Sequence, residues 1–179
     1  MDMYKGYENM RNLVKTETNS RLFLEDPKLK NGEFTKYVSY ISYGTMEVIT
    51  QPQILTTVEG IGPLYMLPWY IENMKGEGDS PVGKIKVVGS PQLMSTGVIR
   101  PNVPNQVFPA TLEASVFQVF EIPGYGRLQN RAQVVITATV DSIPPFQALC
   151  SCLSALLYDD DNVPRGIVDG RALTILPMD

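Results

Sequence analysis

The sequence contains no histidine, which removes the commonest general base and the commonest metal ligand of proteins. Ser-His-Asp sites, Cys-His sites and histidine-based zinc sites are therefore excluded. Only two cysteines are present, Cys150 and Cys152. Two residues that are two apart on a predicted helix point in different directions, so a disulfide between them is disfavoured. We expect two buried thiols in a reducing compartment.

The sequence also lacks a surplus of basic residues and any long apolar run. The net charge is -4 and the isoelectric point about 4.9. A protein that binds nucleic acid without a partner protein usually has a basic surface. No apolar stretch approaches the roughly 18 residues needed to cross a bilayer, and residues 1–6 do not resemble a signal peptide. We expect an intracellular, soluble protein with no membrane partner.

Length and composition indicate one domain over residues 1–179, with residues 1–10 as a flexible lead-in. The chain has 179 residues, of which 44% are hydrophobic and 19% charged, enough for a substantial core. Alternating side chains predict strands over 11–18 and 83–89, and a further strand is predicted over 53–59. Residues 34–50 are rich in Tyr, Val, Ile and Thr and are interrupted at Tyr43-Gly44, which predicts a strand hairpin or two successive strands. Residues 90–106 contain three prolines and no periodicity, and they predict a loop.

Two helices are predicted in the second half. In residues 109–121, Leu112, Val116, Val119 and Phe120 recur at helical spacing. Residues 144–158 carry almost no charge, which is typical of a helix buried on all sides. Strands are predicted on both sides of it, at 131–141 and 166–176, so the chain would end in a strand–helix–strand unit with a right-handed crossover.

Several motifs, in the order in which they follow one another along the chain, resemble those of the ribonuclease PH family. They comprise an arginine-led strand at 11–18, a strand–turn–strand at 38–49, Gly62-Pro63, Tyr125-Gly126-Arg127 before a strand, and the turn at 160–164. In that turn Asn162 replaces the family's glycine, and Asn is the next best residue for a left-handed backbone. The resemblance implies an α+β fold, a ribonuclease PH-like (ribosomal protein S5 domain 2-like) mixed sheet with packed helices. The closing strands and terminal helix of that fold would be missing, because the sequence ends at Asp179.

The sequence departs from the active members of this family. Where they carry a phosphate-binding Gly-Gly-(Ser/Thr)-Arg segment, this chain has Pro144 and Pro145, which remove N–H donors. The catalytic acids beyond the last matched strand are also absent. The resemblance therefore implies a non-catalytic ring subunit of the eukaryotic RNA exosome, with no enzymatic activity and no cofactor. Such a subunit would support the 3'-to-5' processing and degradation of RNA, including rRNA.

Such a subunit would have several partners. They are other ribonuclease PH-like subunits in a hetero-oligomeric ring, cap proteins, a separate nuclease, and RNA passing through the pore. The resemblance further implies localisation in the nucleus, including the nucleolus, and in the cytoplasm.

Three groups of residues are candidates for function. Arg100, Arg127 and Arg131 could contact RNA phosphates, although an exposed arginine more often serves solubility or an ion pair. An apolar cluster could form a subunit interface, or equally a core segment; its members are Tyr65, Met66, Leu67, Trp69 and Tyr70. The acidic run at 159–161 could bind a divalent cation, but a solvated turn accounts for it better.

Two other functions stay open at this point. A β-rich viral or phage coat or tail protein would tolerate the abundant Tyr, Thr, Pro and Gly and the absence of histidine, and it predicts few helices and self-assembly. An active phosphorolytic exoribonuclease is disfavoured, because the phosphate-binding arginine and the terminal acids are missing.

Overall fold

The computed structural model describes residues 3–29, 31–103 and 105–179, without the side chains of residues 152 and 153. In these ranges the chain forms one short 3-10 helix and twelve β-strands. No helix among them is long and apolar enough to cross a membrane. The elements are η1 (Lys5–Tyr7), β1 (Arg11–Glu25), β2 (Phe34–Thr50), β3 (Ile54–Val58), β4 (Gly62–Ser80), β5 (Gly83–Gly89), β6 (Thr96–Pro101), β7 (Ala110–Val116), β8 (Gln118–Ile122), β9 (Gly126–Asn130), β10 (Val134–Val140), β11 (Ala148–Tyr158) and β12 (Pro164–Leu176).

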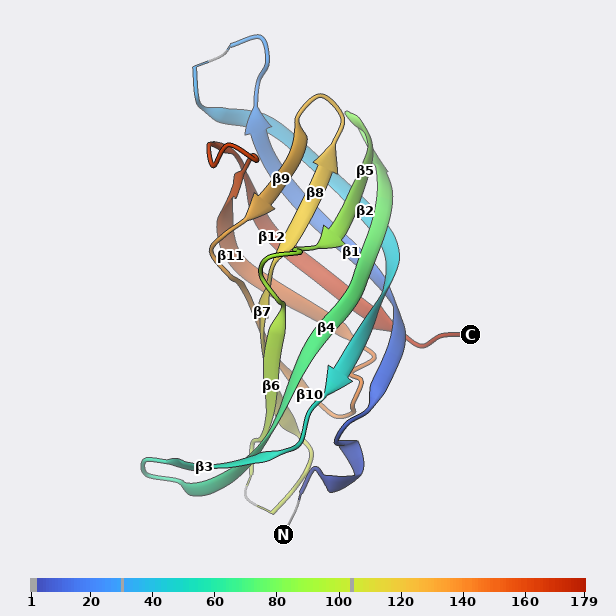
Figure 1. Cartoon of the computed structure of the whole chain (residues 1–179), viewed down its shortest axis with the longest axis vertical. Coiled ribbons are helices and arrows are strands. Elements are labelled where there is room, and N and C mark those ends of the chain that lie inside the picture. Colours follow the sequence, from blue (N-terminus) through green and yellow to red (C-terminus); the bar gives the residue numbers. More distant parts are fainter. Residues whose placement is uncertain (1–2, 30, 104) are drawn as a thin grey trace.

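The strands close into an antiparallel barrel (Figure 1). The long strand β4 pairs with β2 on one side and with β5 on the other. The ring continues from β2 through β1, β12, β11, β9 and β8 back to β5. At the lower end in Figure 1, β6, β7 and β10 continue the wall beside the first half of β4. A closed sheet leaves fewer unpaired edges than an open one.

Two apolar clusters fill the barrel. The lower cluster contains inward side chains of β4, β6, β7 and β10, such as Leu67, Ile99, Leu112 and Ile136. The upper cluster contains inward side chains of β5, β8 and β9, such as Ile85, Phe120 and Leu128. Strand β7 shows how the sequence produces this arrangement, because alternate residues from Ala110 to Val116 are buried.

Both predicted helices are wrong. Residues 109–121 form β7 and β8, because a spacing of four residues fits the two-residue repeat of a strand as well as it fits a helix. Ala110 and Ala114, both buried, complete the strand pattern between the larger side chains. Residues 148–158 of the second prediction form β11, in which Leu149, Ala155 and Leu157 are buried and Leu156 is exposed.

These observations overturn the resemblance to ribonuclease PH and the α+β fold class that it implied. The described chain has no packed helices, and its sheet is antiparallel throughout. The exosome role depended on that resemblance and loses its support. Cys150 is exposed rather than buried, and the expectation for Cys152 falls outside the described side chains.

Most of the predicted strands are present in the structure. Those at 11–18, 53–59, 83–89, 131–141 and 166–176 are confirmed as β1, β3, β5, β10 and β12. The break predicted at Tyr43-Gly44 is wrong, because residues 34–50 form the single continuous strand β2. The loop predicted at 90–106 contains β6. Within the expected lead-in, Tyr4 is fully buried in the lower cluster.

Candidate ligand-binding site

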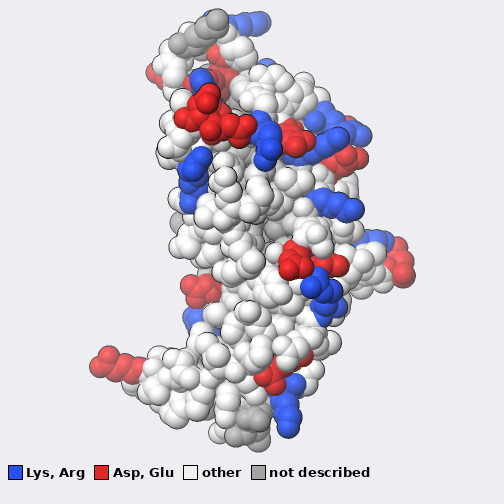
Figure 2. All heavy atoms as spheres, in the orientation of Figure 1, with Lys and Arg blue, Asp and Glu red and all other residues white. Residues whose placement is uncertain are grey.

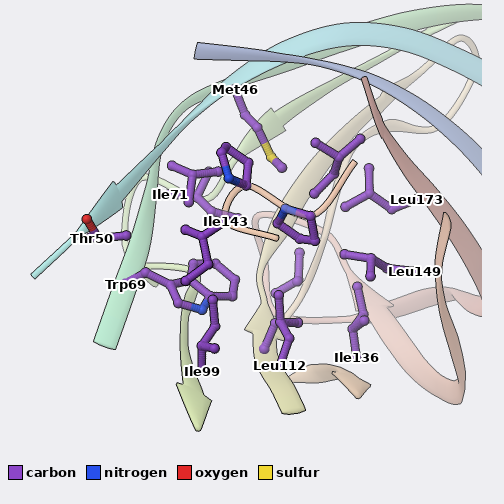
Figure 3. A pocket seen from close by; sticks show the side chains of 16 residues that line it. Met46, Thr50, Trp69, Ile71, Ile99, Leu112, Ile136, Ile143, Leu149 and Leu173 are labelled. Atoms are coloured by element: carbon purple, nitrogen blue, oxygen red, sulfur yellow. The ribbon is translucent and has the colours of Figure 1, made fainter. Parts of the chain in front are cut away.

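The lower half of the barrel encloses a small apolar cavity of about 30 Å³. Its wall comes from strands on opposite sides of the barrel and includes Met46, Trp69, Ile99, Leu112 and Leu173. Figure 3 shows these side chains converging on one space, with Ile143 among them. A barrel of about eight strands is just wide enough to be filled by side chains or to hold one small ligand.

The loop between β10 and β11, residues 141–147, folds into the lower half of the barrel. Ile143, Pro144 and Pro145 from this loop line the cavity, and both prolines are buried. Its end is anchored twice: the side-chain amide of Gln147 donates to the carbonyl of Thr139 at 3.0 Å, and the backbone N–H of Ile175 donates to the carbonyl of Gln147 at 3.1 Å. The loop therefore fills space that would otherwise enlarge the cavity.

The N-terminal segment packs against the same half. The backbone N–H of Tyr4 donates to the side chain of Gln53 at 3.0 Å, and the backbone N–H of Thr50 donates to the carbonyl of Met10 at 2.9 Å. Burial raises the pKa of Tyr4 to about 12. Its buried hydroxyl has no hydrogen-bond partner in the described part of the chain.

A row of buried polar side chains crosses the waist of the barrel, between the two apolar clusters. Ser151 on β11, which is paired with Arg171, belongs to this row and donates a hydrogen bond to the carbonyl of Val135 at 2.7 Å. Three further members matter here. Ser20 on β1 is paired with Tyr40 on β2 and with Arg171 on β12. All three are buried, with Arg171 only 9% exposed. Directly paired residues of neighbouring strands point to the same side of the sheet, so the row faces the interior.

A β-bulge in β12 turns Arg171 inward. A step of two residues in β1, from Ser20 to Leu22, matches a step of three in β12, from Arg171 back to Val168. Gly170 in this bulge adopts a left-handed backbone with φ of +72°. Strict alternation from buried Val168 would direct Arg171 outward; the extra residue reverses its direction.

The guanidinium of Arg171 has unusual surroundings. It forms no ion pair with any acidic residue that the structure describes, and its Nε has no hydrogen-bond partner there. It lies over the ring of Phe120, with 5.4 Å between the guanidinium carbon and the ring centroid. Desolvation lowers the pKa of Arg171 to about 10, so the side chain remains charged at neutral pH.

Tyr40 and Ser20 also carry unused hydrogen-bonding groups. Both hydroxyl oxygens are buried and have no hydrogen-bond partner among the described residues. Burial raises the pKa of Tyr40 to about 12, and the nearby charge of Arg171 and the neighbouring Ser20 hydroxyl oppose that rise. Buried polar groups are normally hydrogen-bonded, so three unused groups in one row stand out.

The three arginines proposed to contact RNA do not form one site. Arg100 on β6 forms an ion pair with Glu113 at 3.0 Å, Arg127 lies on β9, and Arg131 lies over the ring of Tyr158 at 5.7 Å. Basic and acidic side chains are interspersed on the face seen in Figure 2, with wide uncharged areas between them.

The apolar cluster proposed as a subunit interface belongs to β4, and its alternate residues are core. Leu67 and Trp69 are buried in the barrel, so these two side chains cannot form an interface as predicted. Tyr65, Met66 and Tyr70 are half-buried.

The acidic run at 159–161 forms a turn. A carboxylate oxygen of Asp159 accepts hydrogen bonds from the backbone N–H groups of Asp161 and Val163, and the other accepts one from Arg165 at 2.9 Å. These bonds lower the pKa of Asp159. No group of three or more Asp, Glu or Cys in the described residues could hold a metal ion. Asn162 has φ of +63°, the left-handed backbone that the sequence predicted.

Sequence reasoning missed the cavity loop and the polar row. One available signal was Gly170, because an isolated glycine inside a strand pattern suggests a bulge. A bulge before Arg171 would have indicated that this arginine points inward.

Comparison with known proteins defines the fold more closely than the function. No family model and no curated protein matches the sequence. A solved structure, DynF from the dynemicin biosynthesis pathway of Micromonospora chersina, is similar with a TM-score of 0.72 at 20% sequence identity. The match covers 95% of this chain and 81% of DynF. At this level of identity the comparison establishes that the two chains share a β-rich fold.

Proposed function

We propose that this chain is a non-catalytic binding protein whose barrel takes up one small, largely apolar molecule. The observation that carries the proposal is the apolar cavity in the lower half of the barrel, lined in part by a loop instead of a strand. Ligand sites in proteins are concave and mostly apolar, with few polar groups. DynF, which shares the fold, comes from a biosynthesis pathway, a setting in which small molecules are handled.

The size of the cavity determines how binding would occur. A volume of about 30 Å³ is far below the roughly 300–1,000 Å³ of typical ligand pockets. The ligand would therefore displace Ile143 and its neighbours from the interior. This movement requires no strand to separate, because the loop contributes no ladder pairing to the barrel.

The single tryptophan of the chain provides the test. Trp69 lines the cavity, so a bound molecule changes its fluorescence. Titration with octan-1-ol is expected to give a saturable change with one site per chain. The variant Ala114→Leu fills the cavity and should abolish the change. Ala172→Leu adds the same bulk at a position next to Arg171 that lies outside the cavity lining, and it should bind normally. A linear, non-saturable response of the wild-type protein would contradict the proposal.

A loop variant tests how the ligand gains access to the interior. Ile143→Ala should strengthen octan-1-ol binding several-fold, because less apolar bulk has to leave the interior. Phe146→Ala alters an exposed residue of the same loop and serves as the control. Unchanged affinity in Ile143→Ala would show that the loop does not occupy the ligand space.

A second candidate is a self-assembling structural protein of a virus or phage. The near absence of helices in the described chain fits the expectation for such a protein. Large apolar side chains are also exposed on neighbouring strands β1, β2 and β12, namely Leu13, Ile41, Tyr43 and Leu176. Light scattering over a wide concentration range is the test. Assembly into large particles would favour this candidate, and a constant small mass would contradict it.

A further inference from the structure

The buried charge of Arg171 requires an explanation beyond packing. Removing a charge from water is costly unless it is paired and hydrogen-bonded, so buried charges are normally compensated. Arg171 has no acidic partner among the described residues, and its Nε is unused. The contact with Phe120 covers a face of the guanidinium plane, whereas its N–H donors point outward from the edge of that plane.

The neighbours of Arg171 add donors of the same kind. The hydroxyl groups of Tyr40 and Ser20 are buried on adjacent strands, and neither has a hydrogen-bond partner among the residues that the structure describes. A planar guanidinium matches the two oxygens of an oxyanion, and such charge-assisted bonds are about twice as strong as neutral ones. Two hydroxyl donors beside it would complete the coordination of a small anion.

The row also lies next to the apolar cavity. Along β12 the inward residue that follows Arg171 is Leu173, which lines the cavity. The two are about 7 Å apart along the strand, at 3.4 Å per residue. One molecule could therefore place its apolar body in the cavity and its end group at the waist of the barrel.

We propose that the barrel binds an apolar molecule that carries one carboxylate or similar oxyanion, and that Arg171, Tyr40 and Ser20 hold this group. The inference rests on the proposed function, because the apolar body of the ligand occupies the cavity described above. The bulge at Gly170 serves this site, since it turns Arg171 toward the interior.

The test compares two molecules of equal chain length, octanoate and octan-1-ol, with Trp69 fluorescence as the readout. The wild-type protein is expected to bind octanoate at least tenfold more tightly than octan-1-ol at neutral pH. In Arg171→Met the affinity for octanoate falls by at least tenfold, and this preference disappears. Arg171→Lys keeps the positive charge but cannot form bidentate hydrogen bonds with a carboxylate. This variant should show an intermediate preference for octanoate over octan-1-ol.

Stability measurements separate a binding role from a structural one. Replacing an uncompensated buried charge by an apolar side chain is often neutral or stabilising, so Arg171→Met should melt at the same temperature as the wild type or higher. A structural arginine would instead lower the melting temperature and weaken both ligands together. If Arg171→Met fails to fold, Tyr40→Phe removes only the unused hydroxyl and should reduce octanoate binding several-fold.

The outcomes distinguish this inference from the proposed function. Equal binding of octanoate and octan-1-ol by the wild-type protein would overturn the anion site and leave the apolar site standing. Binding of neither molecule would overturn both. Octyl sulfate tests whether the site accepts oxyanions other than carboxylates. If octyl sulfate binds as tightly as octanoate, the site is a general oxyanion site. If octyl sulfate does not bind, the site is restricted to carboxylates.

Discussion

Ser20 and Arg171 are paired across β1 and β12, and both side chains point into the barrel. Immediately beyond this pair the register shifts by one residue, at Gly170. The bulge therefore lies next to the one arginine that is buried among the described residues. Bulges often re-aim a side chain near a functional site, and here the bulge sets the direction of Arg171.

Gly170→Ala is expected to destabilise the barrel by about 1–2 kcal/mol, because a side chain at φ of +72° strains the backbone. The added Cβ would also collide with the guanidinium of Arg21, which must then move. Gly124→Ala, at φ of +83°, has open space around the added Cβ. This control therefore measures the cost of backbone strain without a steric collision. Urea denaturation measures both free energies of unfolding. Gly170→Ala should be at least as destabilised as Gly124→Ala, and wild-type stability would contradict the strained bulge.

Gly97→Ala tests the packing beneath Trp69. The added Cβ would overlap the indole ring of Trp69 and the carbonyl oxygen of Glu113. Overpacking of this kind typically costs about 1–3 kcal/mol, so the midpoint of urea unfolding should fall. Gly89→Ala is the matched control, since its Cβ would meet only the Cβ of Met74 at an ordinary 3.5 Å. Equal stability of the two variants would show that Gly97 is not needed for the position of Trp69.

Tyr40→Phe should leave the ligand-free protein as stable as the wild type or slightly more stable. Its hydroxyl is buried without a described partner, and removal of an unsatisfied polar group costs nothing. Tyr125→Phe removes a hydroxyl that donates to the carbonyl of Glu25 at 2.7 Å, and it should lose about 1 kcal/mol. Thermal unfolding of both variants makes the comparison. A larger loss in Tyr40→Phe would mean that its hydroxyl is bonded in the free protein.

The free energy of unfolding should fall as the pH rises from about 10 to 12. Burial raises the pKa of Tyr4 and of Tyr40 to about 12, above the value near 10 of an unfolded tyrosine. The unfolded chain releases these protons first, so the stabilisation present below pH 10 is lost as the pH approaches 12. Arg171 acts in the opposite direction, because its pKa is lowered to about 10 in the folded state.

Phenylalanine variants identify the tyrosines responsible for this dependence. The double variant Tyr4→Phe/Tyr40→Phe should flatten the fall, measured by urea denaturation at several pH values. Arg171→Met should steepen it, since the opposing contribution is removed. A slope that none of these substitutions changes would assign the dependence to other groups.

Some errors of the sequence reasoning have a specific physical cause. In residues 109–121 the inward positions Leu112, Val116 and Phe120 are four apart, a spacing shared by a helix face and by a strand. In residues 148–158 the lack of charge resembled a buried helix, but it arises from a strand with one face in the core and uncharged residues such as Cys150 and Leu156 outside. Neither ambiguity can be resolved without the partner strands.

The sequence by itself determined the position of many of the strands and the left-handed turn at Asn162, because β-branched alternation and turn chemistry act locally. Only the tertiary structure decided which faces are interior, that the ring closes between β4 and β5, and that Arg171 lies inside with Tyr40 and Ser20. These features depend on register between strands distant in sequence, where one extra residue reverses every side chain that follows.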